Sequence, residues 1–322
     1  MLIARFVNSV VPFVFLICSS SFGATGLPSV PYPAINVGYL INTFNSNFSK
    51  KNSPSSCYKY GELTPFRFFN YAYDNSMDVV SDDGVLKLNG SSRYANAHLA
   101  TFSLIDGKLS GVAFGGGAYF EAELRFDPDK VKPQQGWPAF WALPIEGAAK
   151  IGTGGQWEGM PAGFLNNVEL DFFEYMFSGA SFYSGTIHNW YGEKGRSCSS
   201  GFCRFSTPTE DNKRSYPNNT NIKSFNKYGF LWVPATKDSL GYAKFYFNDI
   251  EVGPPVFWKL WKPDVDKETF VSFSWAFSAM DYSKYFLIIG SGEAQDFEVR
   301  SIRVWQSDAK SNLILNICNS KW

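Results

Sequence analysis

Short runs of alternating apolar and polar residues follow one another along most of this chain. The clearest is AYFEAELRF, in which Phe120, Ala122, Leu124 and Phe126 share one face under the two-residue period of a strand. Similar runs, separated by Gly, Asn, Asp and Pro, occur at residues 85–90, 185–192, 227–234, 244–253, 270–277 and 297–305. With no sustained helical period, the pattern predicts an all-β fold, an antiparallel two-sheet β-sandwich or jelly roll.

The same pattern defines the domain organisation. We find no internal repeat, low-complexity tract or linker, so we expect a single domain over residues 41–310. Residues 24–40 are punctuated by prolines and read as an extended lead-in, and residues 311–322 as a C-terminal tail. Asn248-Asp249 is expected to form a hairpin turn.

The segment VELDFFEYM interrupts the alternation. Its core-facing positions before and after the interruption are Val168, Leu170, Phe172, Tyr175 and Phe177. The first three are out of phase with the last two, and Phe173 falls on the outward face. One inserted residue at Phe172-Phe173, a β-bulge, brings both halves of the strand into register.

The bulge also places Glu169, Asp171 and Glu174 on one face. The two glutamates are then roughly 13 Å apart between Cα atoms. Their side chains can close that gap to the ~5–5.5 Å of a retaining glycosidase or the ~6.5–9.5 Å of an inverting one. Such crowding raises at least one carboxyl pKa, as a general acid requires. The alternative is that the three are solvated charges on the outer face of an edge strand.

Composition narrows the classes of function. Lys plus Arg and Asp plus Glu both number 29, so charge gives no reason to expect a nucleic-acid or anionic-membrane partner. Aromatic residues make up 18% of the chain, and flat rings suit both a packed core and the apolar face of a sugar.

The N-terminus is typical of an exported protein. Residues 1–23 have the positive start, apolar centre and small-residue exit of a signal peptide, with an uncleaved membrane anchor as the alternative. We expect a secreted monomer that does not bind a membrane after cleavage, in the extracellular space, periplasm or cell wall. Four cysteines then remain, Cys57, Cys198, Cys203 and Cys318. We expect them to form two disulfides, and the sequence leaves all three possible pairings open. Paired CxxC motifs are absent and the chain has only two histidines, so we expect no metal centre and no cofactor.

Five segments in order resemble glycoside hydrolase family 16. ELDFFE at 169–174 matches the family's E-x-D-x-x-E signature in its bulged form. The other four are GAYFEAELRF at 117–126, GWPAFWALP at 136–144, YGFLWVPATKDSLGYAKFYFNDIEV at 228–252 and DFEVRSIRVWQ at 296–306.

The resemblance implies a concanavalin-like jelly roll whose concave sheet forms an open glycan cleft. It also implies endo-hydrolysis of β-1,3 or β-1,4 linkages with retention, through a covalent glycosyl-enzyme. Carried over by position, Glu169 is the nucleophile, Glu174 the acid/base, and Asp171 holds a hydrogen bond or proton between them. Some families on this fold carry a structural calcium, for which the sequence gives no signal.

Several aromatic residues are candidates for binding a polysaccharide substrate. Trp137 and Trp141 are predicted sugar platforms, with core packing as the alternative. His188, on the next predicted strand, would tune Glu174 or bind a sugar hydroxyl, and Trp190 shares its face. His98 is expected to be structural.

The substrate is the least determined part of this prediction, because FLIIGSGEAQ at 286–295 departs from the strand often seen in the family's glucanases. A β-1,3- or β-1,3/1,4-glucan is the first expectation. The alternatives are a β-galactan hydrolase, a transglycosylase of the same family, and a non-catalytic lectin-like glycan-binding module.

Overall fold

The structure is a computed structural model. It describes residues 29–48, 63–66, 79–80, 84–88, 97–105, 108–134, 136–152, 167–191, 203–260, 277–291 and 297–315. The predicted signal peptide, three of the four cysteines and most of the predicted strand 270–277 lie outside these residues, so the export and disulfide predictions stay predictions. No helix within the described ranges is long and apolar enough to cross a membrane.

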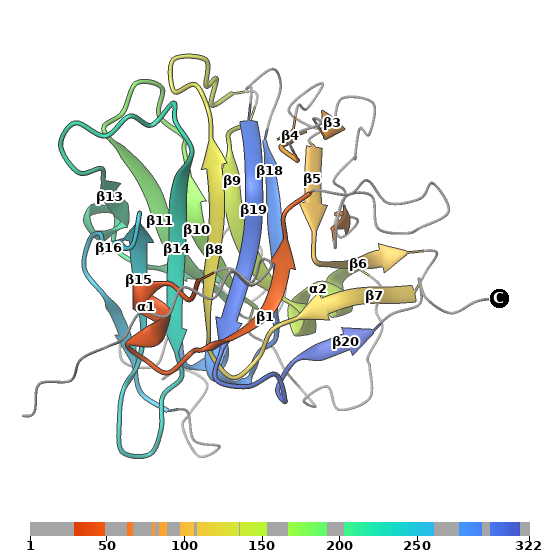
Figure 1. Ribbon diagram of the computed structural model, residues 1–322. Helices are drawn as coiled ribbons and strands as arrows, with labels where there is room; N and C mark the ends of the chain where they lie inside the picture. Colours follow the sequence, from red (N-terminus) through yellow and green to blue (C-terminus); the bar gives the residue numbers. More distant parts are fainter. Residues whose placement is uncertain are drawn as a thin grey trace, which may run out of the picture.

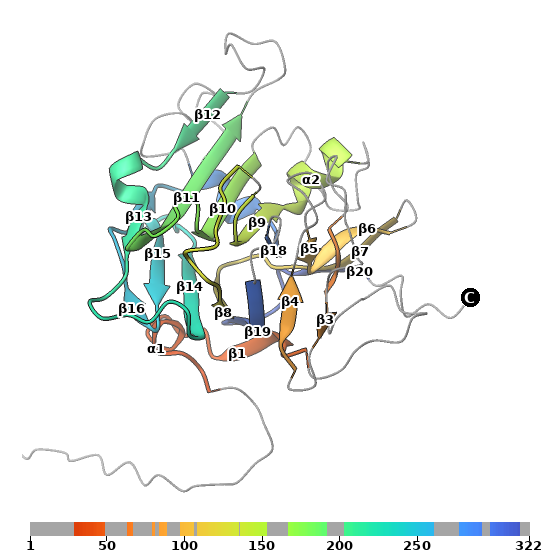
Figure 2. The ribbon, with the colours of Figure 1, turned by 90° about the horizontal axis from the view of Figure 1, so that it is seen from above.

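Two large antiparallel sheets face each other (Figures 1 and 2), which confirms the predicted β-sandwich. In the described part of the chain the first sheet has nine strands, in the order β16-β15-β14-β8-β19-β4-β3, with β1 beside β19 and β17 beside β15. Its strands are β1 (Ile41–Ser46), β3 (Val79–Val80), β4 (Leu86–Leu88), β8 (Ala118–Arg125), β14 (Asn226–Val233), β15 (Gly241–Phe247), β16 (Ile250–Glu251), β17 (Val256–Trp258) and β19 (Phe297–Gln306).

The second sheet has eight strands over the same described ranges, in the order β12-β11-β10-β9-β18-β5-β2, with β13 beside β11. These are β2 (Thr64–Pro65), β5 (Ala97–Ala100), β9 (Ala139–Pro144), β10 (Asn167–Glu174), β11 (Phe182–Tyr191), β12 (Cys203–Ser206), β13 (Lys213–Ser215) and β18 (Tyr285–Ser291). A smaller sheet joins β6 (Phe102–Ile105), β7 (Lys108–Ala113) and β20 (Leu313–Leu315). The short helices are α1 (Tyr32–Ile35), α2 (Ile145–Gly152), η1 (Thr209–Asn212) and η3 (Ser278–Tyr282).

The alternating pattern of β8 is confirmed. Phe120, Ala122 and Leu124 are fully buried between the two sheets, whereas Tyr119 and Glu121 lie on the outer face of the first sheet. The hairpin turn is confirmed as well. Asn248 and Asp249 have φ angles of 49° and 65°, and these two residues alone connect the paired ends of β15 and β16.

Three short segments differ from the sequence prediction. The lead-in is not extended throughout, because a proline in the first turn favours the start of α1, whose Ala34 is buried against the first sheet. The predicted tail contains β20, which pairs with β7. The pattern also gave no sign of α2, which buries Ile145 and Ala148 against the outer face of the second sheet.

The predicted bulge is confirmed in the register of β10. Between Asp171 and Glu174, β10 uses one residue more than β11, and it gains one residue on β9 over the same stretch. Phe173 does not face outward as predicted, because the bulge turns two consecutive side chains into the core. Phe177 is 51% exposed, since β10 ends at Glu174 and the chain leaves the sheet before reaching it.

Both bulge residues are held by aromatic rings. Phe172 has ring-centroid distances of 4.6 Å to Phe230, 5.0 Å to Phe140 and 5.2 Å to Phe120. Phe173 lies 4.3 Å from Tyr228, and both bulge side chains are fully buried. This packing compensates for the broken ladder at the bulge and fixes which way the acidic residues on β10 point.

Replacing Phe172 with Ala is expected to destabilise the fold by about 3–5 kcal/mol, because it leaves a cavity at the centre of this cluster. Phe177→Ala is the matched control. The same change five residues later, on a half-exposed ring, should cost under about 1 kcal/mol. Chemical denaturation of both variants measures the difference, and equal losses would show that the bulge packing has no special role.

Candidate functional site

Glu169, Asp171 and Glu174, here called the acid row, share the outer face of the second sheet. Their cross-strand partners on β11 are His188, Thr186 and Ser184, which succeed one another at two-residue intervals and therefore lie on one face. Val168, Leu170, Phe172 and Phe173 all point to the other side, into the core between the sheets. Without the bulge, Glu174 would point into that core.

Each glutamate of the acid row accepts a hydrogen bond from its own tryptophan. Trp190 Nε1 donates to Glu169 Oε2 at 2.6 Å, and Trp137 Nε1 donates to Glu174 Oε1 at 2.9 Å. The two indoles come from different places, β11 and the segment that precedes β9. Each fixes the orientation of one carboxylate and stabilises its charged form.

His188 is placed over the middle of the acid row. Its Nε2 lies 3.2 Å from Asp171 Oδ2, and its Nδ1 lies 2.5 Å from Ser206 Oγ on β12. The ring also lies beside Trp190, at 5.7 Å between centroids. The imidazole can therefore exchange a proton or hydrogen bond with Asp171 while Ser206 holds its other nitrogen.

Sequence reasoning missed three hydroxyl groups at this site. Ser206 orients His188, and Ser184 Oγ lies 3.1 Å from Thr186 Oγ1 on the stretch of β11 that faces the acid row. The alternation of β11 contained the signal for two of them, because Ser184 and Thr186 share the face of His188 and Trp190. Ser206 could not be found this way, since its position depends on how β12 pairs with β11.

Trp141 and Trp137 occupy different environments. Trp141 is paired with Asp171 on the same face of the sheet, but its ring packs edge-on against Phe66 and His98 and is only 8% exposed. Trp137 is half-buried and touches the acid row directly. Of the two predicted sugar platforms, Trp137 is thus the one in contact with the acids. The buried imidazole of His98 has its pKa lowered to about 4, because burial disfavours the imidazolium ion.

Burial raises the pKa values of all three acids. The pKa of Glu169 rises to about 8, first through burial and second through the neighbouring charge of Asp171, while His188 and the Trp190 hydrogen bond pull it down. The pKa of Asp171 is raised well above its ordinary value by burial and by Glu174. Burial also raises the pKa of Glu174, against the opposing effects of Trp137 and His188.

The acid row therefore carries fewer than three negative charges at neutral pH, and its protons are shared among neighbours. A protonated carboxyl and an ionised carboxylate can coexist a short distance apart on one strand face. That pairing can donate a proton to one atom of a bound molecule while a carboxylate attacks or stabilises another. In the described ranges no group of three or more His, Cys, Asp or Glu side chains is arranged to hold a metal ion.

Comparison with known proteins gives distant structural likenesses. No protein-family model and no curated protein matches the sequence. Among solved structures, LamAcat from Zobellia galactanivorans has 14% identity and a TM-score of 0.49, covering 84% of this chain and 99% of its own. An endo-1,3-β-glucanase from Streptomyces sioyaensis has 17% identity and a TM-score of 0.42, with coverages of 85% and 97%.

A third likeness is partial. The endo-β-galactosidase from Clostridium perfringens that releases GlcNAcα1-4Gal has 13% identity and a TM-score of 0.47, over 82% of this chain. The present chain spans only 61% of that protein. At these identities and scores the likenesses carry no argument about activity, so the functional case below depends on the acid row.

Removing an indole donor is expected to raise the pKa of its glutamate. In Trp190→Phe the hydrogen bond to Glu169 is lost while most of the ring volume is kept, so the pKa of Glu169 should rise above its wild-type value. Carbon-13 NMR titration of the glutamate carboxyls measures this shift. Trp258→Phe is the control, because that indole donates to Asp281 and should leave Glu169 unchanged. A Trp190→Phe titration that superimposes on wild type would contradict the assignment.

Proposed function

We propose that this protein is a retaining endo-glycosidase that cleaves internal β-linkages of a polysaccharide, as its resemblance to glycoside hydrolase family 16 implies. The observation that carries the proposal is the bulged acid row, in which each glutamate is held by a separate indole and the aspartate contacts an imidazole. Burying three like charges together is unfavourable, so a purely structural role gives no reason to keep them.

In the first half-reaction Glu169 attacks the anomeric carbon while Glu174 donates its proton to the departing glycosidic oxygen. Glu169 must be ionised for this step, and the Trp190 hydrogen bond and His188 both favour its charged form. Asp171 assists by holding a proton, because a neutral Asp171 removes the nearest like charge from Glu169. Bond formation to Glu169 and bond cleavage at the leaving sugar give a glycosyl ester.

In the second half-reaction Glu174 is a carboxylate and acts as general base. It takes a proton from an incoming water, whose oxygen attacks the anomeric carbon and releases Glu169. Two inversions at the same carbon give net retention. A sugar hydroxyl in place of water would give transglycosylation, which remains the alternative outcome at the same site.

For the substrate we propose a β-1,3- or β-1,3/1,4-glucan, with a β-galactan as the alternative within the same chemistry. Trp137, Trp190 and His188 are proposed to bind the sugar rings around the acid row, and Trp141 would do so only with the edge of its ring. The alternative from another functional class is a non-catalytic, lectin-like glycan-binding module. The enzyme is proposed to act outside the cytoplasm, as an exported monomer without metal or cofactor.

Glu169→Ala is expected to reduce hydrolysis at least about a thousandfold, because it removes the nucleophile. Glu174→Gln should lower kcat about 10²- to 10⁴-fold on polysaccharide, and much less on an aryl glycoside whose leaving group needs no proton. The assay is reducing-sugar release from laminarin, mixed-linkage glucan and agarose. NMR of the first product should show a retained anomeric configuration.

The matched control is Glu298→Gln, a carboxylate on β19 of the other sheet that should leave the rate unchanged. Wild-type protein that binds these glycans without cleaving them would establish the lectin-like alternative. An inverted first product would remove Glu169 as the nucleophile.

The pH profile of kcat/KM should have an acid limb well above the ordinary glutamate value of 4.5, because burial and Asp171 raise the pKa of Glu169 to about 8. Asp171→Asn keeps this neighbour neutral at every pH, so an ionised Asp171 can no longer oppose the ionisation of Glu169 and the acid limb should move to lower pH. The control variant Asp238→Asn, on the exposed loop between β14 and β15, should leave the profile in place. An acid limb that stays fixed in Asp171→Asn would contradict the proposed coupling.

A further inference from the structure

A cavity lies on the face of the molecule opposite the acid row. Helix α1 lies against the outer face of the first sheet near β15 (Figure 1), and between them is a cavity of about 310 Å³, here called the α1 groove. The residues of the α1 groove used below are Tyr32, Tyr242, Lys244, Asp249 and Glu251. Because Ala243, Phe245 and Phe247 point into the core between the sheets, Tyr242 and Lys244 point away from it.

Two tyrosines flank the α1 groove from separate elements. Tyr32 on α1 is 68% exposed, and Tyr242 on β15 is half-buried. The ring of Tyr242 has two neighbours. The ring of Phe257 lies 6.2 Å away between centroids, and Lys244 Nζ lies 5.7 Å from the centroid of the Tyr242 ring. The groove therefore presents two aromatic rings, each with an apolar face and a wet hydroxyl, from elements that are themselves packed.

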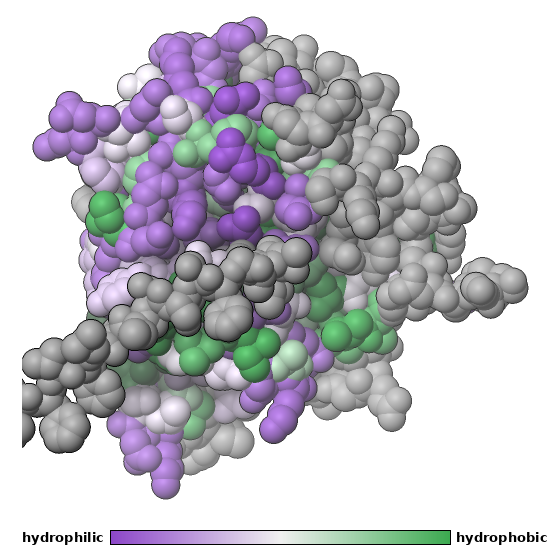
Figure 3. Space-filling view, viewed as in Figure 1, coloured by the Kyte–Doolittle hydropathy of each residue, from purple (hydrophilic) through white to green (hydrophobic). Residues whose placement is uncertain are grey.

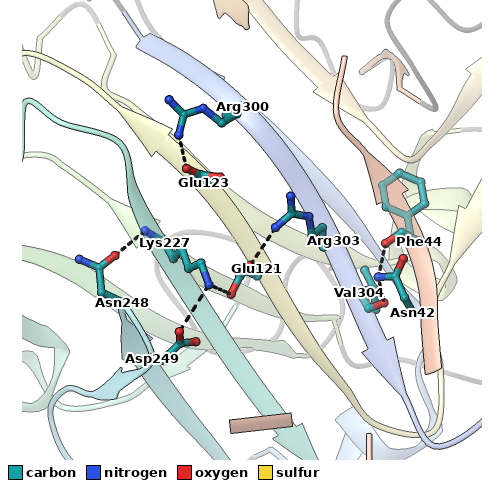
Figure 4. A network of polar contacts seen from close by, with 10 residues as sticks. All are labelled: Asn42, Phe44, Glu121, Glu123, Lys227, Asn248, Asp249, Arg300, Arg303 and Val304. Carbon is teal, nitrogen blue, oxygen red and sulfur yellow. Dashed lines mark hydrogen bonds and ion pairs between the residues drawn. The ribbon is translucent and has the colours of Figure 1, made fainter. Parts of the chain in front are cut away.

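The charges around the α1 groove are balanced in pairs. Lys244 Nζ lies 2.9 Å from Glu251 Oε2, and Lys227 Nζ lies 3.4 Å from Asp249 Oδ2. Lys227 also faces Glu121 Oε2 at 3.9 Å, and Arg303 lies 3.8 Å from Glu121 on the other side (Figure 4). Such a surface attracts neither a phosphate nor a cation strongly. In Figure 3 hydrophilic residues cover the upper part of this face, and pale and hydrophobic residues lie lower down, towards the position of α1 in Figure 1.

Asp249 is already engaged within the protein. Its Oδ2 accepts a hydrogen bond from Lys227 Nζ, and its Oδ1 is buried at the atom level with no partner among the residues that the structure describes, so the case for a ligand does not depend on Asp249. Aromatic faces and paired charges together match a neutral ligand rich in hydroxyl groups.

We propose that the α1 groove is a second, non-catalytic saccharide-binding site, which holds part of a neutral polysaccharide chain. The statement that this polysaccharide is also the one cleaved at the acid row rests on the proposed function. A chain held at both faces is kept at high effective concentration near the acid row, whereas a short oligosaccharide occupies the two sites independently. The groove thus assists cleavage of long chains and has no effect on the bond-breaking step.

Binding is tested in the Glu169→Gln background, which prevents cleavage during the measurement. Calorimetric titrations with laminaritetraose, and in parallel with oligoagarose, should give two sites per chain for one of these sugars. Adding Tyr32→Ala and Tyr242→Ala should leave one site. Adding Tyr282→Ala instead, a tyrosine 40% exposed outside the α1 groove, should leave two. Two sites in the Tyr32→Ala/Tyr242→Ala variant, one site in the Glu169→Gln parent, or no binding of either sugar would overturn the inference.

Kinetics separate this inference from the proposed function. In the active protein, Tyr32→Ala/Tyr242→Ala should raise KM for laminarin about tenfold and leave both kcat and the rate on laminaritetraose unchanged. Tyr32→Ala alone, on a largely exposed ring, guards against a folding defect and should give part of the same rise. Tyrosine-dependent binding without any cleavage would refute the proposed glycosidase activity and support the saccharide site in the α1 groove. Cleavage with an unaltered KM for laminarin in the double variant would refute that saccharide site and support the glycosidase activity.

Discussion

One extra residue in β10 is the constraint on which the site depends. A regular strand that buries Val168, Leu170 and Phe172 must send Glu174 into the core, where an unpaired carboxylate is strongly unfavourable. The bulge exchanges that charge for a second phenylalanine, so the core gains the ring of Phe173 and the outer face gains an acid. Packing on one side of the strand thereby determines the chemistry on the other.

The electrostatics of the acid row follow from this arrangement. Neighbouring acids and burial all push the carboxyl pKa values upward, and the opposing effects come from uncharged donors on two indoles and from one imidazole. Neutral donors stabilise a carboxylate without fixing it permanently in the charged form, as a lysine or arginine partner would do. The row can therefore gain and lose protons during a reaction cycle.

Much of this could be predicted from the sequence because the signals were local. The two-residue period gave the sandwich, the break in that period gave the bulge, and Asn248-Asp249 gave its turn. The predicted outward direction of Phe173 was wrong, because the regular two-residue period does not continue through the bulge, where Phe172 and Phe173 both point into the core. Helix α2, strand β20 and the contact between Ser206 and His188 depend on pairing between distant segments, for which a short sequence window contains no information.

The two indole donors also bear on how such a site can change over evolutionary time. Trp190 lies on the strand next to Glu169, whereas Trp137 belongs to the segment that enters β9. Since no single substitution removes both donors, the two hydrogen bonds can be lost or gained one at a time. A lineage carrying this arrangement can adapt to acidic or alkaline surroundings through one-residue steps, each of which leaves the other indole hydrogen bond in place.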